Sequence, residues 1–181
     1  MDFCLVFGEP GIGKSTAVAA ALAQAEVLGE FRDPLPHIVY RDISQHRYAC
    51  QLGRISGTFP GTDGLSYNIV NKVVPFIASA SFASVIAEGD RLSNLPFISS
   101  LPDTWDVDVI HLYADDPQFA EDRRWARAGA IGKTQNASWV KGRRTKAWRL
   151  AESLPNCVWF DVRNDDVVEF LRNRPAFARV A

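Results

Sequence analysis

Cysteine and histidine are scarce in this sequence, with only three of each among 181 residues. The cysteines are Cys4, Cys50 and Cys157. Because their number is odd and none belongs to a Cys-x-x-Cys pair, we expect buried free thiols in a reducing compartment. The histidines are scattered as well, so the sequence offers no spacing typical of a zinc site.

Long apolar runs are also missing. No run approaches the roughly 18 apolar residues that a transmembrane helix needs, so we expect no membrane partner. The chain enters a short apolar segment, Phe3–Phe7, without a basic stretch before it, which is not typical of a signal peptide. These absences predict a cytoplasmic protein.

The sequence has no excess of charge of either sign. Its formal net charge is −1, and 47% of its residues are hydrophobic. This balance predicts a folded chain with one core, and we expect a single domain over residues 1–181. It excludes a bulk polycation, so any contact with nucleic acid has to come from a local basic patch.

What the sequence does contain is an alternation of short apolar segments and helical segments. The expected strands are Phe3–Phe7, His37–Asp42, a strand ending within Phe82–Asp90, Val107–Ala114 and Cys157–Val162. The expected helices are Ser15–Leu28, Leu65–Ser81, Pro117–Arg127, Ser138–Glu152 and Asp165–Asn173. The alternation predicts an α/β fold with a mostly parallel five-stranded sheet and helices on both faces. The glycine-rich stretch from Tyr48 to Gly64 is expected to be a loop over the carboxyl edge of the sheet.

The segment GEPGIGKST matches the phosphate-loop pattern G-x-x-x-x-G-K-[ST], with an apolar strand before it and a helix after it. Glycines let successive backbone N–H groups converge on phosphate oxygens, and the helix adds the positive end of its dipole. We expect Lys14 to bind the β- and γ-phosphates of ATP and the Ser15 hydroxyl to ligate Mg²⁺. The residues expected around the nucleotide are Gly8, Glu9, Pro10, Gly11, Ile12, Gly13, Lys14, Ser15 and Thr16. The loop predicts a P-loop nucleoside-triphosphate-binding fold.

Two carboxylates follow the third expected strand, in the segment IAEGDR. A carboxylate at the end of this strand faces the magnesium site across the edge of the sheet. Glu88 is therefore a candidate to support the metal, and Asp90 is a candidate to support the metal or to position the acceptor. The alternative is an acidic surface turn in which Asp90 caps a helix that begins at Leu92.

A kinase also needs a carboxylate to orient the acceptor hydroxyl. Asp42 ends the second expected strand, which we expect beside the phosphate loop. Asp63 lies in the glycine-rich stretch that is expected to cover the site. Either aspartate could serve, and the alternative for each is an ordinary turn residue.

The segment 116–149 is basic and carries three tryptophans, Trp125, Trp139 and Trp148. Its cations are Arg123, Arg124, Arg127, Lys133, Lys141, Arg143, Arg144, Lys146 and Arg149. One interpretation is a lid whose arginines, among them Arg123, Arg127 and Arg143, neutralise charge on the transferring phosphate. A second is that some cations follow a nucleic-acid backbone while an aromatic ring stacks on a base. The third is a solvated helix face with about half of the cations in water and at least two tryptophans in the core.

On these segments the chain resembles the P-loop kinases, and more narrowly the small bacteriophage kinases that act on 5-hydroxymethyluracil already in DNA. Apart from the phosphate loop, the resemblance lies in FPGTDGLS (Phe59–Ser66), VIAEGDRLSN (Val85–Asn94) and ASWVKGRRTK (Ala137–Lys146). The resemblance implies transfer of the γ-phosphoryl group of ATP to the hydroxymethyl oxygen of the base. This is a step in thymidine hypermodification, which protects viral DNA from host nucleases.

The resemblance also implies ATP and Mg²⁺ as cofactors, DNA containing 5-hydroxymethyluracil as the partner, and the host cytoplasm as the location. Among the residues, it carries over to the phosphate loop from Gly8 to Ser15. A target base would have to be exposed or flipped out of a duplex to reach the phosphate. The alternatives are a kinase of a free nucleotide or another small hydroxyl-bearing molecule, and a nucleotide-dependent switch.

Overall fold

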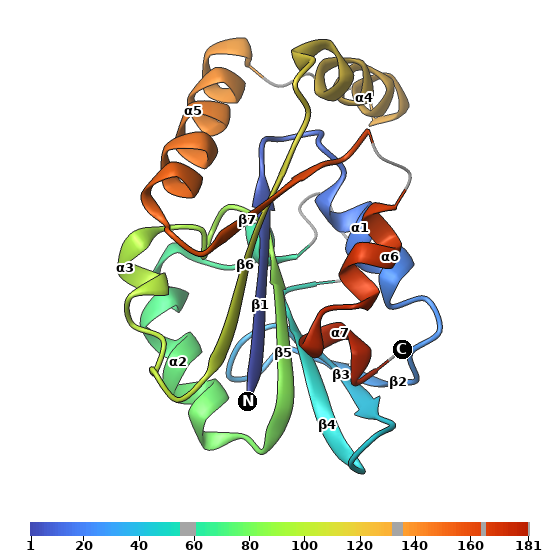
Figure 1. Cartoon of the computed structure of the whole chain (residues 1–181), viewed down its shortest axis with the longest axis vertical. Helices are drawn as coiled ribbons and strands as arrows, with labels where there is room; N and C mark the ends of the chain where they lie inside the picture. The colour runs from blue at the N-terminus through green and yellow to red at the C-terminus, as the bar shows by residue number, and fades with distance from the viewer. Residues whose placement is uncertain (55–60, 132–135, 164–165, 181) are drawn as a thin grey trace.

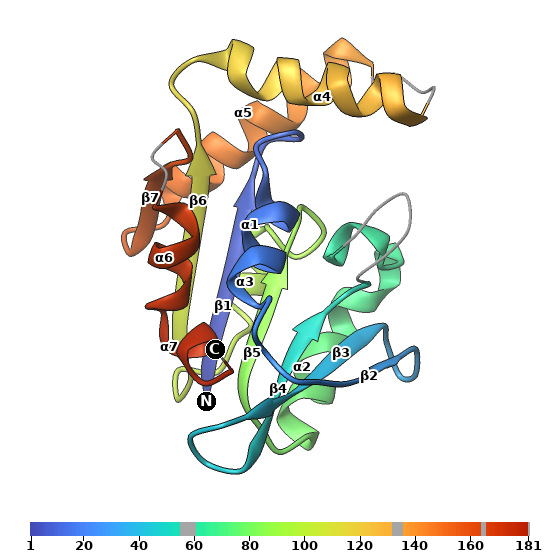
Figure 2. The ribbon, with the colours of Figure 1, turned by 90° about the vertical axis from the view of Figure 1, so that its right-hand side faces the viewer.

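A computed structural model shows one twisted sheet between two layers of helices, with a pair of helices across one end (Figure 1). It describes residues 1–54, 61–131, 136–163 and 166–180. Both termini lie at the end of the sheet opposite to the helix pair (Figure 2). The three cysteines are free thiols, and Cys4 and Cys50 are buried. None of the helices in the described part of the chain is both long and apolar enough to cross a membrane.

Within these described ranges the sheet has seven strands, in the spatial order β2-β3-β4-β5-β1-β6-β7. The strands are β1 (Asp2–Gly8), β2 (Val27–Phe31), β3 (His37–Asp42), β4 (Arg47–Leu52), β5 (Phe82–Glu88), β6 (Asp106–Tyr113) and β7 (Cys157–Asp161). The pairs β4–β5, β5–β1, β1–β6 and β6–β7 are parallel, whereas β3 is antiparallel to both β2 and β4. The carboxyl ends of β4, β5, β1, β6 and β7 therefore share one edge.

The helices bury their apolar sides against the two faces of the sheet. They are α1 (Lys14–Ala21), α2 (Val70–Ser79), α3 (Leu95–Ile98), α4 (Pro117–Ile131), α5 (Ala137–Ser153), α6 (Val167–Arg172) and α7 (Pro175–Ala178). One core lies under α1, α6 and α7, and the other lies under α2, α3 and the second half of α5. Helix α4 crosses the carboxyl edge of the sheet (Figures 1 and 2). Alternating residues of β1 are buried in the two cores, which holds the strand that leads into the phosphate loop at the centre of the sheet.

The α/β fold with a mostly parallel sheet is confirmed, but five strands is a wrong number because β2 and β4 were not expected. Strand β4 occupies residues that were expected to form the first part of a loop from Tyr48 to Gly64. Its first two residues are exposed and polar or aromatic, so its apolar run is short. Strand β2 is an exposed edge strand containing Gly29, and its first two residues, Val27 and Leu28, were assigned to the preceding helix. Residues 55–60, including Phe59, lie outside the described residues.

The helix after the phosphate loop is shorter than expected, since α1 ends at Ala21 and not at Leu28. The expected helix from Leu65 begins only at Val70, after two short 3-10 turns at Thr62–Gly64 and Tyr67–Ile69. Asp90 does not cap a helix beginning at Leu92. The helix in that region, α3, begins later and is capped by Asn94, whose Oδ1 accepts the backbone N–H of Phe97 at 3.0 Å.

An aromatic cluster joins α5 to the β6–β7 side of the sheet. Its centre is His111, which is 1% exposed and lies against Phe7, Tyr113, Trp148 and Trp159. Burial, and then the positive charge of Lys14, lower the pKa of His111 to about 4. The imidazole is therefore neutral at pH 7, and it behaves as an aromatic core residue.

This lowered pKa predicts an acid-sensitive contribution of His111 to stability. The contribution is complete above the unfolded-state pKa of about 6.5 and is lost as the pH falls toward 4, because the unfolded chain binds the proton first. The test is denaturant unfolding of the wild type and of His111→Phe at pH 7.5 and 4.5. Between these pH values, the free energy of unfolding should fall about 2–3 kcal/mol more for the wild type than for the variant. Burial raises the pKa values of Glu9 and Glu88, so these groups give the opposite dependence of stability on pH. Because both proteins contain them, the comparison with the variant cancels their contribution. Equal losses would contradict the assignment.

Candidate active site

The phosphate loop connects the carboxyl end of β1 to the first turn of α1. Gly11 and Gly13 have φ angles of +86° and +104°, which favour glycine and turn the backbone inward. Helix α1 begins without a side-chain cap and without an acidic residue in its first turn. Its first backbone N–H groups are therefore suited to an anion such as a phosphate.

The ammonium group of Lys14 lies within the curve of this loop. Its Nζ donates hydrogen bonds to the carbonyl oxygens of Gly8 at 3.1 Å and Glu9 at 3.0 Å, and the residue is 9% exposed. The loop itself thus fixes a positive charge where phosphate oxygens would meet the backbone N–H groups. The role of Lys14 in binding the β- and γ-phosphates stays a prediction.

Ser15 and Glu88 lie together at the carboxyl edge. The Ser15 hydroxyl donates to Oε1 of Glu88 at 2.9 Å, and Glu88, the last residue of β5, is 2% exposed. Burial raises the pKa of Glu88, against the lowering effects of Lys14 and the Ser15 hydrogen bond. A buried carboxylate held this way is stabilised by a cation.

The pair fits Mg²⁺, which prefers hard oxygen ligands and usually takes only one or two from the protein. No cluster of three or more His, Cys, Asp or Glu side chains forms a closed metal site within the described ranges. Ser15 and Glu88 would hold the ion directly or through water, together with oxygens of the phosphates. The ion would supply charge neutralisation across the β- and γ-phosphates.

The segment after β4 closes against Glu88. Thr62 Oγ1 donates to the backbone carbonyl of Glu88 at 2.9 Å, and a Cβ built on Gly61 would lie 2.0 Å from Glu88 Oε1. Asp63 Oδ1 accepts the backbone N–H of Asp90 at 2.6 Å. The structure thus brings Asp63 to the same edge as Ser15 and Glu88, and its role toward an acceptor stays a prediction.

Asp90 connects this edge to α5. Its carboxylate forms ion pairs with Arg143 and with Lys146, the latter at 2.9 Å, and its backbone carbonyl also accepts from Lys146 at 3.2 Å. Two cations therefore already hold the carboxylate. Asp90 is better suited to fixing α5 beside the site than to accepting a proton.

Arginines of α4 and α5 cover the phosphate loop from the outside. Arg124 donates to the carbonyl of Pro10 at 2.8 Å. A Cβ built on Gly13 would lie 3.1 Å from Nη1 of Arg123. We call α4 and α5 together the lid, because their cations reach the loop from the two sides.

Glu9 is the loop residue that the lid arginines approach. It is 4% exposed, with its carboxylate 3.6 Å from Arg124 and 3.8 Å from Arg144. Burial raises the pKa of Glu9, and the two arginines oppose that shift. The sequence placed Glu9 in the loop but gave no sign of this pairing, and Arg144 was one of several cations in a basic segment.

Not every expected residue comes to the site. Asp42 lies at the opposite edge of the sheet, because β3 is antiparallel to β4; its Oδ1 accepts from the backbone N–H and hydroxyl of Ser44. Arg127 is exposed on α4. Lys133 lies outside the described residues.

The expectation that at least two of the three lid tryptophans pack in the core is wrong. Trp148 belongs to the aromatic cluster around His111, but Trp125 is 60% exposed and Trp139 is 44% exposed. Trp139 instead lies under the guanidinium of Arg143, 5.3 Å from its ring centroid. The two exposed rings leave aromatic surface on the lid.

Comparison with known proteins gives a match over nearly the whole chain. The family described as P-loop Nucleotide Kinase3 matches residues 2–178. The matched range contains the phosphate loop, the Ser15–Glu88 pair and both lid helices. A search of curated proteins found no match.

Proposed function

The chain belongs to the P-loop Nucleotide Kinase3 family, and from that premise we propose that it phosphorylates the hydroxymethyl oxygen of 5-hydroxymethyluracil in DNA. As a P-loop kinase it is a nucleotide-binding phosphotransferase. The identity of the acceptor is the proposed part. It rests on the resemblance of three segments to the phage kinases and on where those segments meet.

The observation that carries the proposal is the junction of these segments. Asp63 comes from the first, Asp90 from the second, and Arg143 and Lys146 from the third. Asp63 accepts the N–H of Asp90, and Asp90 pairs with both cations of α5. Segments that are distant in the sequence therefore form one cluster beside Ser15 and Glu88, where an acceptor would have to lie.

In this proposal each residue of the site has one role in phosphoryl transfer. Lys14 and the loop N–H groups bind phosphate oxygens, and the lid arginine Arg123 neutralises charge from the outside. Asp63 orients the acceptor hydroxyl and takes its proton as the acceptor oxygen forms its bond to the γ-phosphorus. The bond from that phosphorus to the β–γ bridging oxygen breaks, and ADP leaves. ATP supplies the phosphoryl group.

A free nucleotide is the alternative acceptor, since the description of the matched family names nucleotide kinases. In that case the lid cations would bind only the phosphates of small molecules. The two acceptors make different demands on the outer surface of the lid, because only a polymer extends beyond the site.

Phosphate transfer from labelled ATP to three acceptors tests the proposal. The acceptors are DNA containing 5-hydroxymethyluracil, matched DNA containing thymine, and the free hydroxymethyl nucleotide. We expect label on the modified DNA alone, and its loss when EDTA removes the metal. Label only on the free nucleotide would overturn the proposal in favour of the alternative. Lys14→Ala protein, prepared in the same way, controls for contaminating kinases.

A further inference from the structure

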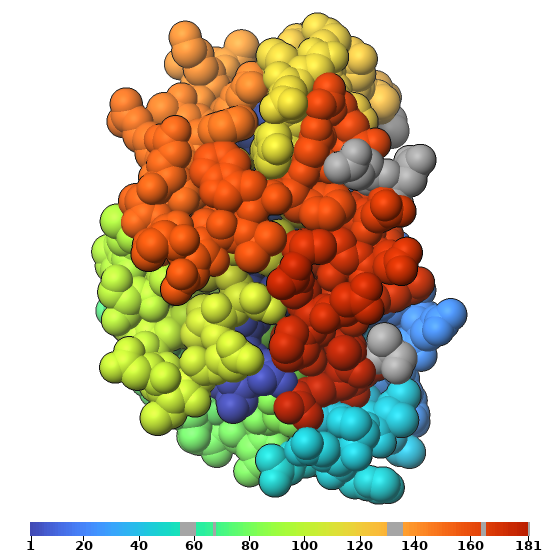
Figure 3. Space-filling model, viewed as in Figure 1, coloured from blue at the N-terminus to red at the C-terminus, as the bar shows by residue number. Residues whose placement is uncertain are grey.

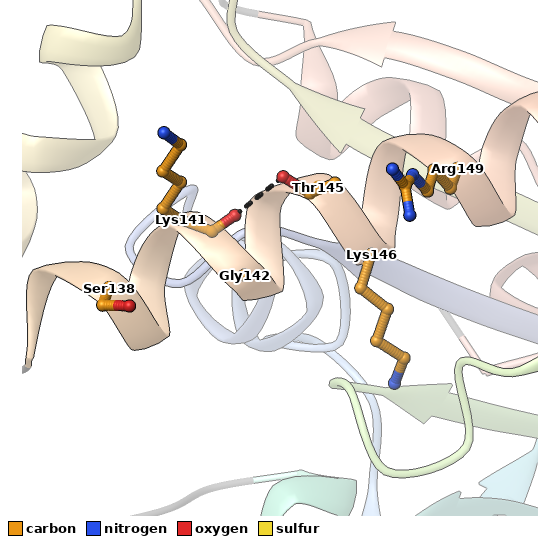
Figure 4. A pocket seen from close by; sticks show the side chains of 6 residues that line it. All are labelled: Ser138, Lys141, Gly142, Thr145, Lys146 and Arg149. Atoms are coloured by element: carbon orange, nitrogen blue, oxygen red, sulfur yellow. Dashed lines mark hydrogen bonds between the residues drawn. The ribbon is translucent and has the colours of Figure 1, made fainter.

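The outer side of α5 forms a shallow hollow of about 580 Å³ beside the active site. Its lining residues recur every three or four positions, so they share one side of the helix. They are Ser138, Lys141, Gly142, Thr145, Lys146 and Arg149 (Figure 4). We call this surface the α5 face. In the space-filling view, α5 lies exposed beside α4 at the end of the molecule that holds the carboxyl edge of the sheet (Figure 3).

The five cations of α5 fall into two groups. Arg144 approaches Glu9 of the phosphate loop, and Arg143 and Lys146 pair with Asp90. Lys141 and Arg149 are exposed, and neither forms an ion pair with a carboxylate of the described residues. The helix has a single acidic residue, at its carboxyl end. The α5 face therefore carries positive charge that the fold does not use.

The surface between these cations is bare. Gly142 lies in the interior of a 17-residue helix, and a Cβ built on it would meet nothing within 4 Å. Glycine is a poor helix former, and packing does not require one here, so neither effect explains its presence. The neighbouring Thr145 is small, and its hydroxyl donates to the carbonyl of Lys141 at 3.0 Å. A ligand chain can consequently approach the helix backbone closely.

The α5 face is continuous with the active site. Lys146 extends from one edge of the α5 face toward the segment after β5, whereas Lys141 extends from the opposite edge of the same face (Figure 4). Lys146 bonds Asp90, whose N–H bonds Asp63. A strand lying along the face would thus be linked to Asp63 through Lys146 and Asp90.

We propose that the α5 face binds the phosphodiester backbone of the DNA acceptor, an inference that rests on the proposed function for the identity of the polymer. Lys141 and Arg149 each neutralise a phosphate, and Gly142 permits close approach. Eight residues of helix separate the two cations by about 12 Å. One strand of B-form DNA, with a phosphate every ~3.4 Å along the axis, covers that span in about four nucleotides. Arg123, Arg124 and Arg144 remain with the phosphate loop.

The test is the affinity of a fluorescent 20-nucleotide DNA for the whole protein at several salt concentrations. Lys141→Gln/Arg149→Gln should weaken binding at low salt about tenfold or more. It should also reduce the slope of log K against log salt by about 1.4–1.8, since each lost phosphate contact removes about 0.7–0.9. Arg47→Gln/Lys72→Gln removes two exposed cations from β4 and α2 and should leave both values unchanged.

A second pair of variants tests the close approach without a change of charge. Gly142→Gln places a side chain on the α5 face, whereas Gly129→Gln does the same at an exposed, equally unhindered position of α4. Both should preserve or raise the melting temperature, because both replace a glycine within a helix. Only Gly142→Gln should weaken DNA binding. Equal effects of the two substitutions would count against the α5 face.

DNA binding and phosphate transfer are separate readouts, so the two proposals can fail separately. If label enters 5-hydroxymethyluracil DNA but the α5 variants bind DNA like the wild type, the interface is wrong and the proposed function stands. If the α5 variants lose salt-dependent DNA binding but the wild type transfers no label to the modified DNA, the interface stands and the proposed acceptor is wrong. A wild type that does not bind DNA overturns the interface outright.

Discussion

Replacing Lys14 with alanine is expected to lower the rate of phosphoryl transfer by at least about 10³-fold, which corresponds to about 4 kcal/mol of transition-state stabilisation. The ammonium is buried and fixed by the carbonyl oxygens of Gly8 and Glu9. Charge spreads over the oxygens of the transferring phosphoryl group, so a preorganised cation stabilises the transition state without a reorganisation cost. A more distant lid arginine such as Arg123 cannot take its place without moving.

Steady-state transfer of label from ATP measures this loss, with thermal melting to show that the variant is folded. Lys72→Ala is the matched control, since it removes an exposed lysine from α2, away from the loop. We expect the control to retain the wild-type rate. A Lys14→Ala enzyme that keeps more than about a tenth of the activity would show that the lysine has only a structural part in holding the loop.

The pairing of Ser15 with Glu88 follows from simple features of the sequence. An apolar strand followed by the phosphate-loop pattern fixes Ser15 at the carboxyl end of β1. A second apolar strand ending in Glu88 brings a carboxylate to the same edge, provided that the two strands are parallel neighbours, as β1 and β5 are. Both strands are buried on both faces, and continuous apolar runs of this kind are the clearest strand signal in a sequence.

The placement of Asp42 could not be predicted in the same way, because the direction of a strand is not encoded within it. His37–Asp42 was expected beside β1 and parallel to it. Strand β4 follows after only four residues, and so short a connection permits only an antiparallel pair. Strand β4 lies in a polar, glycine-rich stretch that was expected to form a loop. Once β4 separates β3 from β5, Asp42 has to lie at the far edge.

The lid shows a third limit of prediction from the sequence, because the sequence does not indicate in which direction each side of a helix faces. The composition of residues 116–149 indicates a basic segment but not which of its cations reach the loop. Arg124 and Arg144 face Glu9, while Lys141 and Arg149 face solvent, although all four belong to the same charged stretch. Helical spacing groups residues into sides, and only the packing of Val140, Ala147 and Leu150 determines which side turns inward.

Replacing Asp63 with asparagine is expected to lower kcat by about 10²- to 10⁴-fold while leaving the affinity for ATP little changed. Asparagine keeps Oδ1 as an acceptor for the N–H of Asp90, so the segment after β4 can retain its contact with β5. What is lost is the negative charge and the second oxygen that can take the proton of the acceptor hydroxyl. The effect should therefore appear in turnover and not in nucleotide binding.

Asp42→Asn provides the control, because it makes the same chemical change at the opposite edge of the sheet. Its kcat should equal that of the wild type, with melting curves showing that both variants are folded. If Asp63→Asn turns over at the wild-type rate, Asp63 serves only to anchor its segment to Asp90. The proton would then have to pass to a carboxylate that already pairs with Arg143 and Lys146, or directly to water. A general base held by two cations is a weak one, so that outcome would favour a mechanism driven by charge neutralisation alone.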